Sequence, residues 1–266
     1  MPITCQASVR VLTLEDFKRL DHEVMRHAFA SQNDLGRLCE EAVYQADLAA
    51  RLRANGFTDT HTRVGVRVSH ADFAKPYYVD LLADHALYEL KAVPVFSDRH
   101  RAQLIHYMLL LGFRCGKLLN FGSERVDGRL HSTRLTPSTR RKITTDMSRW
   151  QPQSPPCEEL QKIMLALLAD WGSFLEVSLY EEALTHFLGG PDWVKQRVPL
   201  SRGTVALGSQ TMNIHTRGSG IVVTSFNTEL ASHETNLRKL LAHSPLSTLQ
   251  WINLKHALVQ FTTLTR

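Results

Sequence analysis

The chain has 266 residues, of which 43% are hydrophobic and 21% charged, and its formal net charge at pH 7 is +5. This composition is that of a globular protein and excludes a disordered or membrane-embedded chain. The length suits one large domain or two of moderate size. The positive charge favours a polyanionic partner such as nucleic acid without requiring one.

No targeting or membrane segment is indicated. The first ten residues contain no basic patch followed by an apolar run, and no later stretch is apolar over the thickness of a bilayer. We therefore expect a cytoplasmic protein with no membrane partner. The cysteines lie far apart and form no C-x-x-C pair, so neither a zinc site nor a disulfide framework is indicated.

The first predicted elements are a helix and three strands. Apolar residues recur at steps of three and four over 34–55, before an Asn-Gly stop signal, and this pattern predicts a helix. Valines alternate with polar residues over 64–68, which predicts a strand. Two short runs, 78–83 and 86–93, are separated by Asp84-His85, a spacing that predicts a hairpin.

A second helix and a further strand complete this half of the chain. Ser97-Asp98 begins a helix that is expected to run to about Leu111 and to end at Gly112. Residues 117–121 are expected to form a strand. This order of elements is that of a mixed α/β domain, which we assign to residues 1–130.

Residues 131–158 differ in character from what precedes them. They contain the basic cluster Arg140-Arg141-Lys142 and four prolines, at 137, 152, 155 and 156. We interpret the segment as a basic, proline-containing linker. A solvated connection is favoured over a dedicated nucleic-acid arm, although such lysines and arginines can contact phosphates.

Residues 159–266 show weak similarity to the first half. The glycine, glutamate and tyrosine of Leu35–Tyr44 recur in Trp171–Tyr180. His100 and Leu104 are matched by His and Leu at 233 and 237, and the segment 118–120 is matched by 251–253. The offset falls only from 136 to 133. We therefore expect two tandem copies of one module.

One constellation in the first half can carry chemistry. With Asp84-His85 as a two-residue turn, Asp80 lies opposite Glu89, and opposed side chains point to one face with Cβ atoms roughly 5 Å apart. Lys91 shares that face because it lies two residues beyond Glu89. Two carboxylates so close together favour a hard divalent cation such as Mg²⁺, and a nearby lysine can orient or deprotonate a metal-bound water.

The sequence around this constellation resembles the GxxExxY family of the PD-(D/E)XK nuclease-like superfamily. The resemblance covers about 34–122, and it departs from the family pattern in having Leu38 where the first glycine of the family name would stand and no proline before Asp80. The following segments carry it: Leu35-Gly36, Glu41 with Tyr44, Asp80-Leu81-Leu82, Glu89–Val93, His100–Leu104 with Tyr107, and Leu118–Gly122.

The resemblance implies a restriction-endonuclease-like fold, a mixed sheet flanked by helices. It implies that Asp80, Glu89 and Glu41 are metal ligands for Mg²⁺, with Mn²⁺ as a substitute. Lys91 would orient the attacking water or stabilise the transition state, and Gln103 would lie beside it. For Glu41 and Gln103 a solvated or structural role stays open.

The second half lacks this constellation. Residues 208–228 contain no Asp, Glu or Lys, and the alignment places Asn213, Val222 and Thr224 at the positions of the acid, acid and lysine. Val177 stands where the first helix would carry its glutamate. We therefore expect a degenerate second copy that retains the fold, so that the chain forms an intrachain pseudo-dimer and can act as a monomer.

The expected function is hydrolysis of phosphodiester bonds in nucleic acid by a metal-dependent nuclease, with DNA favoured and RNA left open. Two alternatives remain. The chain could be a non-catalytic nucleic-acid-binding module that keeps the fold, or a protein-interaction scaffold. A requirement for divalent metal separates the nuclease from both.

Overall fold

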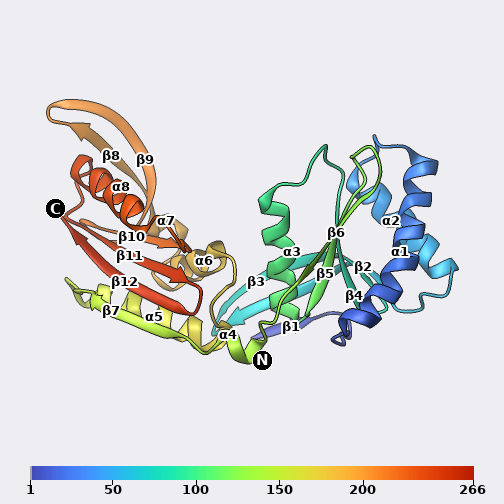
Figure 1. The fold of residues 1–266 in the computed structure, drawn as a ribbon. Coiled ribbons are helices and arrows are strands. Elements are labelled where there is room, and N and C mark those ends of the chain that lie inside the picture. The colour runs from blue at the N-terminus through green and yellow to red at the C-terminus, as the bar shows by residue number, and fades with distance from the viewer. Residues whose placement is uncertain (1) are drawn as a thin grey trace. The chain divides into compact units, whose positions relative to one another are not determined.

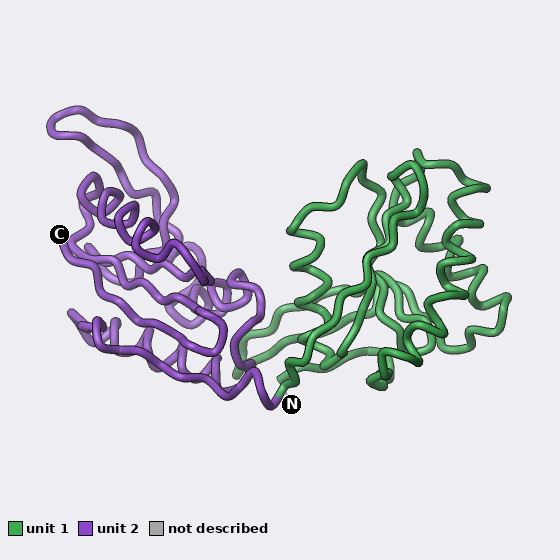
Figure 2. Tube along the Cα trace, viewed as in Figure 1, with its two compact units in different colours: residues 1–137 green, residues 138–266 purple. Residues whose placement is uncertain are grey.

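The computed structural model describes residues 2–266 and divides the chain into two compact units, Met1–Pro137 and Ser138–Arg266 (Figure 2). We call these unit 1 and unit 2. No helix within residues 2–266 combines the length and the apolar character that crossing a membrane requires.

Unit 1 contains a mixed sheet with helices on both of its faces (Figure 1). Its elements in chain order are β1 (Ile3–Cys5), α1 (Leu14–Leu35), α2 (Glu41–Ala54), β2 (Thr60–His70), β3 (Phe73–Ala83), β4 (Ala86–Lys91), α3 (Asp98–Leu111), β5 (Cys115–Asn120) and β6 (Asp127–Ser132). The strands follow one another in the sheet in chain order. All neighbouring pairs are antiparallel except β4 and β5, which are parallel and are connected through α3. The mixed α/β fold expected for this half is confirmed.

The helix predicted over 34–55 begins too early, because two helices meet in this region. Gly36 ends α1 with a φ of +74°, a conformation that L side chains rarely adopt. The chain then bends at Arg37 and Cys39, and α2 begins after Glu40. Thr13 is a start signal for α1 in the sequence, since its side chain caps the helix by accepting from the backbone N–H of Asp16.

The predicted hairpin between β3 and β4 forms at Asp84-His85. Both residues have positive φ, +44° and +71°, as a two-residue turn that follows the sheet twist requires. Pairing runs from Ala83 with Ala86 to Leu81 with Tyr88. The hairpin therefore has the register expected from the sequence over these pairs.

The core of unit 1 is packed on the face of the sheet that α1 and α2 cover. It includes Phe17, Tyr44 and Leu48 from the helices and Tyr88 and Leu90 from the central strand β4. The opposite face of β4 lies toward α3, because a Cβ added at Gly116 on the adjacent strand would meet the side chains of Leu87, Leu104 and Met108. β4 is thus covered on both faces, and every residue in it is buried.

Unit 2 also combines a mixed sheet with helices (Figure 1). Its elements are β7 (Thr144–Arg149), α5 (Pro155–Trp171), α6 (Val177–Phe187), α7 (Pro191–Val194), β8 (Lys195–Arg202), β9 (Val205–Thr216), β10 (Ser219–Thr224), α8 (Leu230–His243), β11 (Thr248–Lys255) and β12 (Leu258–Thr265). The strands are arranged in the order β7-β12-β11-β10-β9-β8. The segment 131–158, expected as a linker, contains the end of β6, the short helix α4 (Pro137–Arg140), β7 and the start of α5.

The order of elements from α5 to β12 repeats that from α1 to β6, with the short α7 added. In unit 2 the pairs β8–β9, β9–β10 and β11–β12 are antiparallel, and β10 and β11 are parallel and connected through α8. These senses agree with those of the corresponding strands of unit 1.

Two side-chain arrangements also recur between the units. Tyr44 donates its hydroxyl hydrogen to the carbonyl of Gly36 at 2.7 Å, and Tyr180 does the same to Gly172 at 2.6 Å. Gly172 ends α5 with a φ of +77°, close to the +74° of Gly36. In each unit, a tyrosine on the second helix therefore fixes the glycine that ends the first.

The second arrangement is an asparagine that holds the backbone just beyond the neighbouring parallel strand. Asn120 accepts from the N–H of Val93 at 3.0 Å and donates to its carbonyl at 2.7 Å. Asn253 makes the same pair of hydrogen bonds with Phe226, at 2.8 and 2.9 Å.

Candidate active site

Three elements of unit 1 meet at the candidate site. Glu89 and Lys91 are two residues apart on β4, so strand alternation places them on one face. Asp80 lies on the adjacent β3, and Glu41 is the first residue of α2. A carboxylate at this first position is also favoured by the helix dipole.

The four side chains converge on the ammonium of Lys91. Its Nζ donates to Glu89 Oε1 at 2.7 Å and lies 3.6 Å from both Asp80 Oδ2 and Glu41 Oε2. It also donates to the carbonyl of Leu90 at 2.7 Å. We call Glu41, Asp80, Glu89 and Lys91 the acidic cluster.

The position of Asp80 differs in detail from a simple continuation of the hairpin. The recorded pairing of β3 with β4 ends at Leu81 and Tyr88, one pair before Asp80 and Glu89. The carboxylate of Asp80 instead accepts a hydrogen bond from the backbone N–H of Leu90 at 2.8 Å. This contact turns the carboxylate along β4 toward Lys91.

The cluster is closed at one end and open at the other. Glu89 is fully buried and Lys91 is 8% exposed. The side chain of Asp80 is 17% exposed and that of Glu41 is 41% exposed. A ligand would therefore approach from the side of Glu41, with Glu89 at the base of the site.

Burial and excess negative charge shift the pKa values within the cluster. Burial, together with the charge of Asp80, raises the pKa of Glu89 from 4.5 to about 8, against the opposing effect of Lys91. Burial also raises the pKa of Glu41. For Lys91, burial lowers the pKa, but the charges of Glu89 and Asp80 outweigh it and the pKa is raised. These shifts share one origin, because three carboxyl groups face a single ammonium. The carboxyl groups therefore hold a proton at a pH at which isolated carboxyl groups would have lost it.

Two polar side chains that the sequence analysis did not assign to the site support it. Gln45 donates to the carbonyl of Asp80 at 2.8 Å. It lies one helical turn after Glu41, a spacing that would have placed both on one helix face. Asn120 pairs with Lys91 across β4 and β5 and binds the backbone of Val93, which fixes the chain just after Lys91.

Gln103 is the one predicted site residue that the structure does not bring to the cluster. Its amide donates to the hydroxyl of Tyr107 at 3.2 Å. Within residues 2–266 no hydrogen bond joins Gln103 to the acidic cluster. His100, on the same helix, accepts from the N–H of Ser97 in a capping box, and its pKa is lowered by burial and by the charge of Lys91.

The cluster offers the ligand atoms that a hard divalent cation prefers. Its donors are carboxylate oxygens, and Oε2 of Glu89 is buried without a hydrogen-bond partner in the described part of the chain. The present arrangement centres on Lys91 instead. Among residues 2–266, no three His, Cys, Asp or Glu side chains are grouped so as to hold a metal by themselves. Metal binding therefore requires the carboxylates to turn from the ammonium toward the ion.

The comparisons with known proteins point to one superfamily. Neither the curated proteins nor the solved structures contain a match to the chain. Residues 18–132 match the family model described as the PD-(D/E)XK nuclease superfamily. The match spans α1 to β6 and includes every residue of the acidic cluster. Unit 1 is therefore similar, over most of its length, to the PD-(D/E)XK nuclease superfamily.

Proposed function

We propose that unit 1 is a Mg²⁺-dependent nuclease that hydrolyses phosphodiester bonds in DNA. The observation that carries this proposal is the convergence of Asp80, Glu89 and Glu41 around Lys91, within the region that matches the nuclease superfamily. Within that superfamily, the motifs around these residues favour the GxxExxY family.

Asp80 and Glu89 would hold the metal, with Glu41 as a third carboxylate at the open side. Asp80 is oriented by the N–H of Leu90, and the unpartnered Oε2 of Glu89 is free to turn toward an ion. A bound Mg²⁺ would supply Lewis acidity, lowering the pKa of a coordinated water and offsetting charge on the phosphate. Gln45 and Asn120 act as positioning residues, because they hold the backbone on either side of these ligands.

Lys91 would orient the attacking water or stabilise charge at the phosphate, because its Nζ lies among the three carboxylates that would hold the metal. For His100 a capping role is favoured over a contact with the substrate, because its Nδ1 accepts from the N–H of Ser97. We assign Gln103 no role in the reaction, because its amide donates to the hydroxyl of Tyr107.

We propose further that unit 2 is a duplicate of unit 1 whose site has been lost. The order of elements, the Tyr–Gly bond and the asparagine contact recur in both units, and the asparagines are 133 residues apart. If Asn253 corresponds to Asn120, the strand registers support Val222 as the counterpart of Glu89 and Thr224 as the counterpart of Lys91. An apolar side chain and a hydroxyl cannot replace a carboxylate and an ammonium.

The counterpart of Asp80 is one residue away from the position expected from the sequence. Tyr88 pairs with Leu81, whereas Ile221 pairs with Asn213, so Asn213 corresponds to Leu81. Met212 then takes the position of Asp80. The difference arises because the pairing of β9 with β10 shifts by one residue between Ser219 and Gly220. Neither residue is acidic, so the loss of the site does not depend on this detail.

The rival function is nucleic-acid binding without turnover, in which unit 1 keeps the fold but does not cleave. The deciding experiment incubates the full chain with linear and supercoiled DNA, and separately with RNA, in Mg²⁺, Mn²⁺ or EDTA. We expect cleavage of DNA only with metal, and a loss of at least about 100-fold in Lys91→Met. Asp80→Asn should abolish cleavage while circular dichroism remains unchanged.

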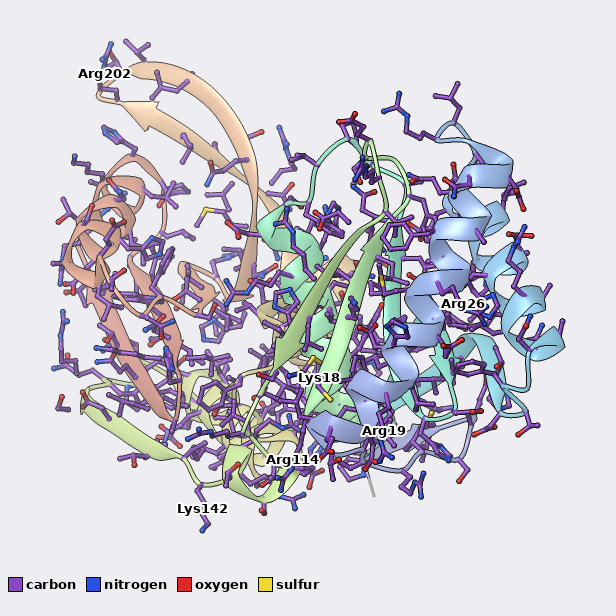
Figure 3. The ribbon with its side chains drawn as sticks, turned by 45° about the vertical axis from the view of Figure 1, so that its right-hand side comes forward. Lys18, Arg19, Arg26, Arg114, Lys142 and Arg202 are labelled. Carbon is purple, nitrogen blue, oxygen red and sulfur yellow. The ribbon has the colours of Figure 1, made fainter. Side chains whose placement is uncertain are left out.

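Lys18→Met provides the matched control, because Lys18 is exposed on α1 (Figure 3). This variant removes the same charge from unit 1 and should cleave as the wild type does. Cleavage by Asp80→Asn at the wild-type rate, or cleavage in excess EDTA, would rule out the acidic cluster as the active site. Metal-independent binding with no cleavage of any substrate would favour the rival function.

A further inference from the structure

The hairpin of β8 and β9 has a long exposed outer part in unit 2. It is paired from Lys195 with Asn213 to Arg202 with Val205, and Gly203, with a φ of +59°, lies in its turn. Figure 1 shows it curving away from the sheet to which its base belongs. All residues from 201 to 211 are exposed, although alternate residues of a strand point to opposite faces. The outer part of the hairpin therefore has no buried face.

The base of the same hairpin is packed normally. Val198 and Met212 are 5% and 8% exposed and belong to the core of unit 2 with Leu237 and Leu241. The imidazole Nδ1 of His243, at the end of α8, lies 2.9 Å from the carbonyl oxygen of Ser201, close to the turn. The side chains are thus buried only at the base, whereas the outer part contacts α8 through the backbone of Ser201.

The corresponding hairpin of unit 1 is not exposed in this way. β1 pairs along the outer part of β2, through Ile3 with Val68 and Cys5 with Val66. Val66 and Val68 are 1% and 0% exposed. In unit 2, β8 is the last strand of its sheet, and no strand among residues 2–266 lies beyond it. Unit 2 has therefore kept a hairpin whose outer part contributes nothing to its core.

The charge of this hairpin is of one sign. No Asp or Glu occurs between residues 193 and 228, whereas β8 contains Lys195, Arg197 and Arg202. Arg197 and Arg202 are exposed, and Figure 3 shows Arg202 at the outer end of the hairpin. Lys195 is less available, because its charge acts on Glu181 of α6. An exposed, acid-free projection suits a polyanion.

The dimensions of the hairpin narrow the choice of polyanion. A two-stranded ribbon fits the major groove of B-form DNA, which is about 12 Å wide, whereas the major groove of A-form RNA is too deep and narrow for side chains to read. From Arg197 to Arg202 the strand extends about 17 Å at roughly 3.3 Å per residue. Arg197 and Arg202 are five residues apart and therefore point to opposite faces of β8, so each can reach a phosphate on a different wall of one groove.

We propose that the β8–β9 hairpin binds double-stranded DNA by lying in its major groove, with Arg197 and Arg202 on the phosphates. The inference rests on the proposed function in one respect, namely that a nuclease must hold its substrate. Association with a second copy through the free edge of β8 is disfavoured, because Pro199 and the charged arginines oppose the addition of a further strand.

The test measures binding of the full chain to a fluorescent 30-base-pair DNA duplex in EDTA, where metal-dependent cleavage does not occur. The double variant Arg197→Gln/Arg202→Gln removes two charges from the hairpin. Losing two phosphate contacts should lower the slope of log K against log salt by about 1.8, and should weaken binding by up to roughly 60-fold at about 0.1 M salt. An RNA duplex of the same sequence should compete weakly.

The control is Lys162→Gln/Lys239→Gln, which removes two charges from exposed positions on α5 and α8 of the same unit. It should bind DNA with the wild-type salt slope. The proposal is overturned by an unchanged slope in the arginine variant, by equal losses in both double variants, or by equal competition from RNA. It is also overturned if light scattering shows that the arginine variant loses self-association instead of DNA binding.

Failure of the nuclease proposal gives a different result. If the protein binds DNA through Arg197 and Arg202 but cleaves nothing with Mg²⁺, the hairpin proposal stands and the nuclease proposal is refuted. If it cleaves DNA but the double arginine variant binds as the wild type does, the nuclease proposal stands and the hairpin proposal is refuted.

Discussion

The Tyr–Gly bond offers a matched pair of perturbations, one in each unit. Tyr44→Phe removes the hydroxyl that donates to Gly36 and accepts from the N–H of Cys39, at 3.3 Å. Tyr180→Phe removes the hydroxyl that donates to Gly172 and is hydrogen-bonded by the backbone of Leu175. Both tyrosine side chains are fully buried, so water does not replace these bonds.

The expected cost follows from the number of partners left unsatisfied. Each substitution leaves a backbone carbonyl without its hydrogen-bond donor and removes the acceptor of a second backbone N–H. We expect this to destabilise the unit that carries the substitution by about 1–3 kcal/mol. Tyr44→Phe should also reduce DNA cleavage, because the bond fixes the chain that leads into α2, where Glu41 is the first residue. Tyr180→Phe should leave cleavage unchanged.

The two units can be followed separately by spectroscopy. All four tryptophans, at 150, 171, 193 and 251, belong to unit 2. In urea titrations, tryptophan fluorescence reports on unit 2 and far-UV circular dichroism on both. Tyr180→Phe should therefore shift the fluorescence midpoint, and Tyr44→Phe should shift only the circular dichroism.

Tyr78→Phe is the control, because this side chain is 52% exposed and lies under Arg63 at the surface. It should change stability by less than about 0.5 kcal/mol. A loss below that value in either buried variant would refute the reasoning for that unit. A loss in one unit alone would show that the bond is not a shared structural device and would weaken the case for duplication.

Three further outcomes are expected. Asn120→Ala should destabilise unit 1 by about 2–4 kcal/mol and reduce cleavage, because it frees the backbone at Val93, whereas Asn253→Ala should destabilise unit 2 alone; equal cleavage by the two variants would contradict this. Hydrogen bonding to Arg149, against the effect of burial, lowers the pKa of Glu234 to about 2, so its stabilisation of unit 2 is complete above about pH 4.5 and is lost as the pH falls toward 2; the fluorescence midpoint of Glu234→Gln should approach that of the wild type over this range, and a constant difference would be inconsistent with the shift. Mg²⁺ at about ten times its dissociation constant should stabilise unit 1 by about 1.4 kcal/mol in the wild type, and an equal gain in Asp80→Asn would remove that residue from the metal site.

Local sequence pattern was enough to predict the site hairpin. A two-residue turn fixes strand pairing, and strand alternation then fixes which side chains share a face. The sequence therefore predicted that Asp80, Glu89 and Lys91 lie together, and in the structure Lys91 Nζ lies within 3.6 Å of carboxylate oxygens of Asp80, Glu89 and Glu41. The boundary of α2 could not be predicted in the same way, because the periodic apolar pattern continues through residues 36–40, which connect α1 to α2.

The features that only the tertiary structure decided depend on contacts between residues far apart in the sequence. Asn120 binds Val93, 27 residues away, and no periodicity marks that pairing. The pairing of β9 with β10 shifts by one residue between Ser219 and Gly220, which the sequence pattern does not mark. The exposure of the β8–β9 hairpin depends on the absence, among the described residues, of a strand beyond β8. A sequence pattern specifies which face of a strand is apolar, but whether a neighbour covers that strand is set by how the whole sheet is assembled.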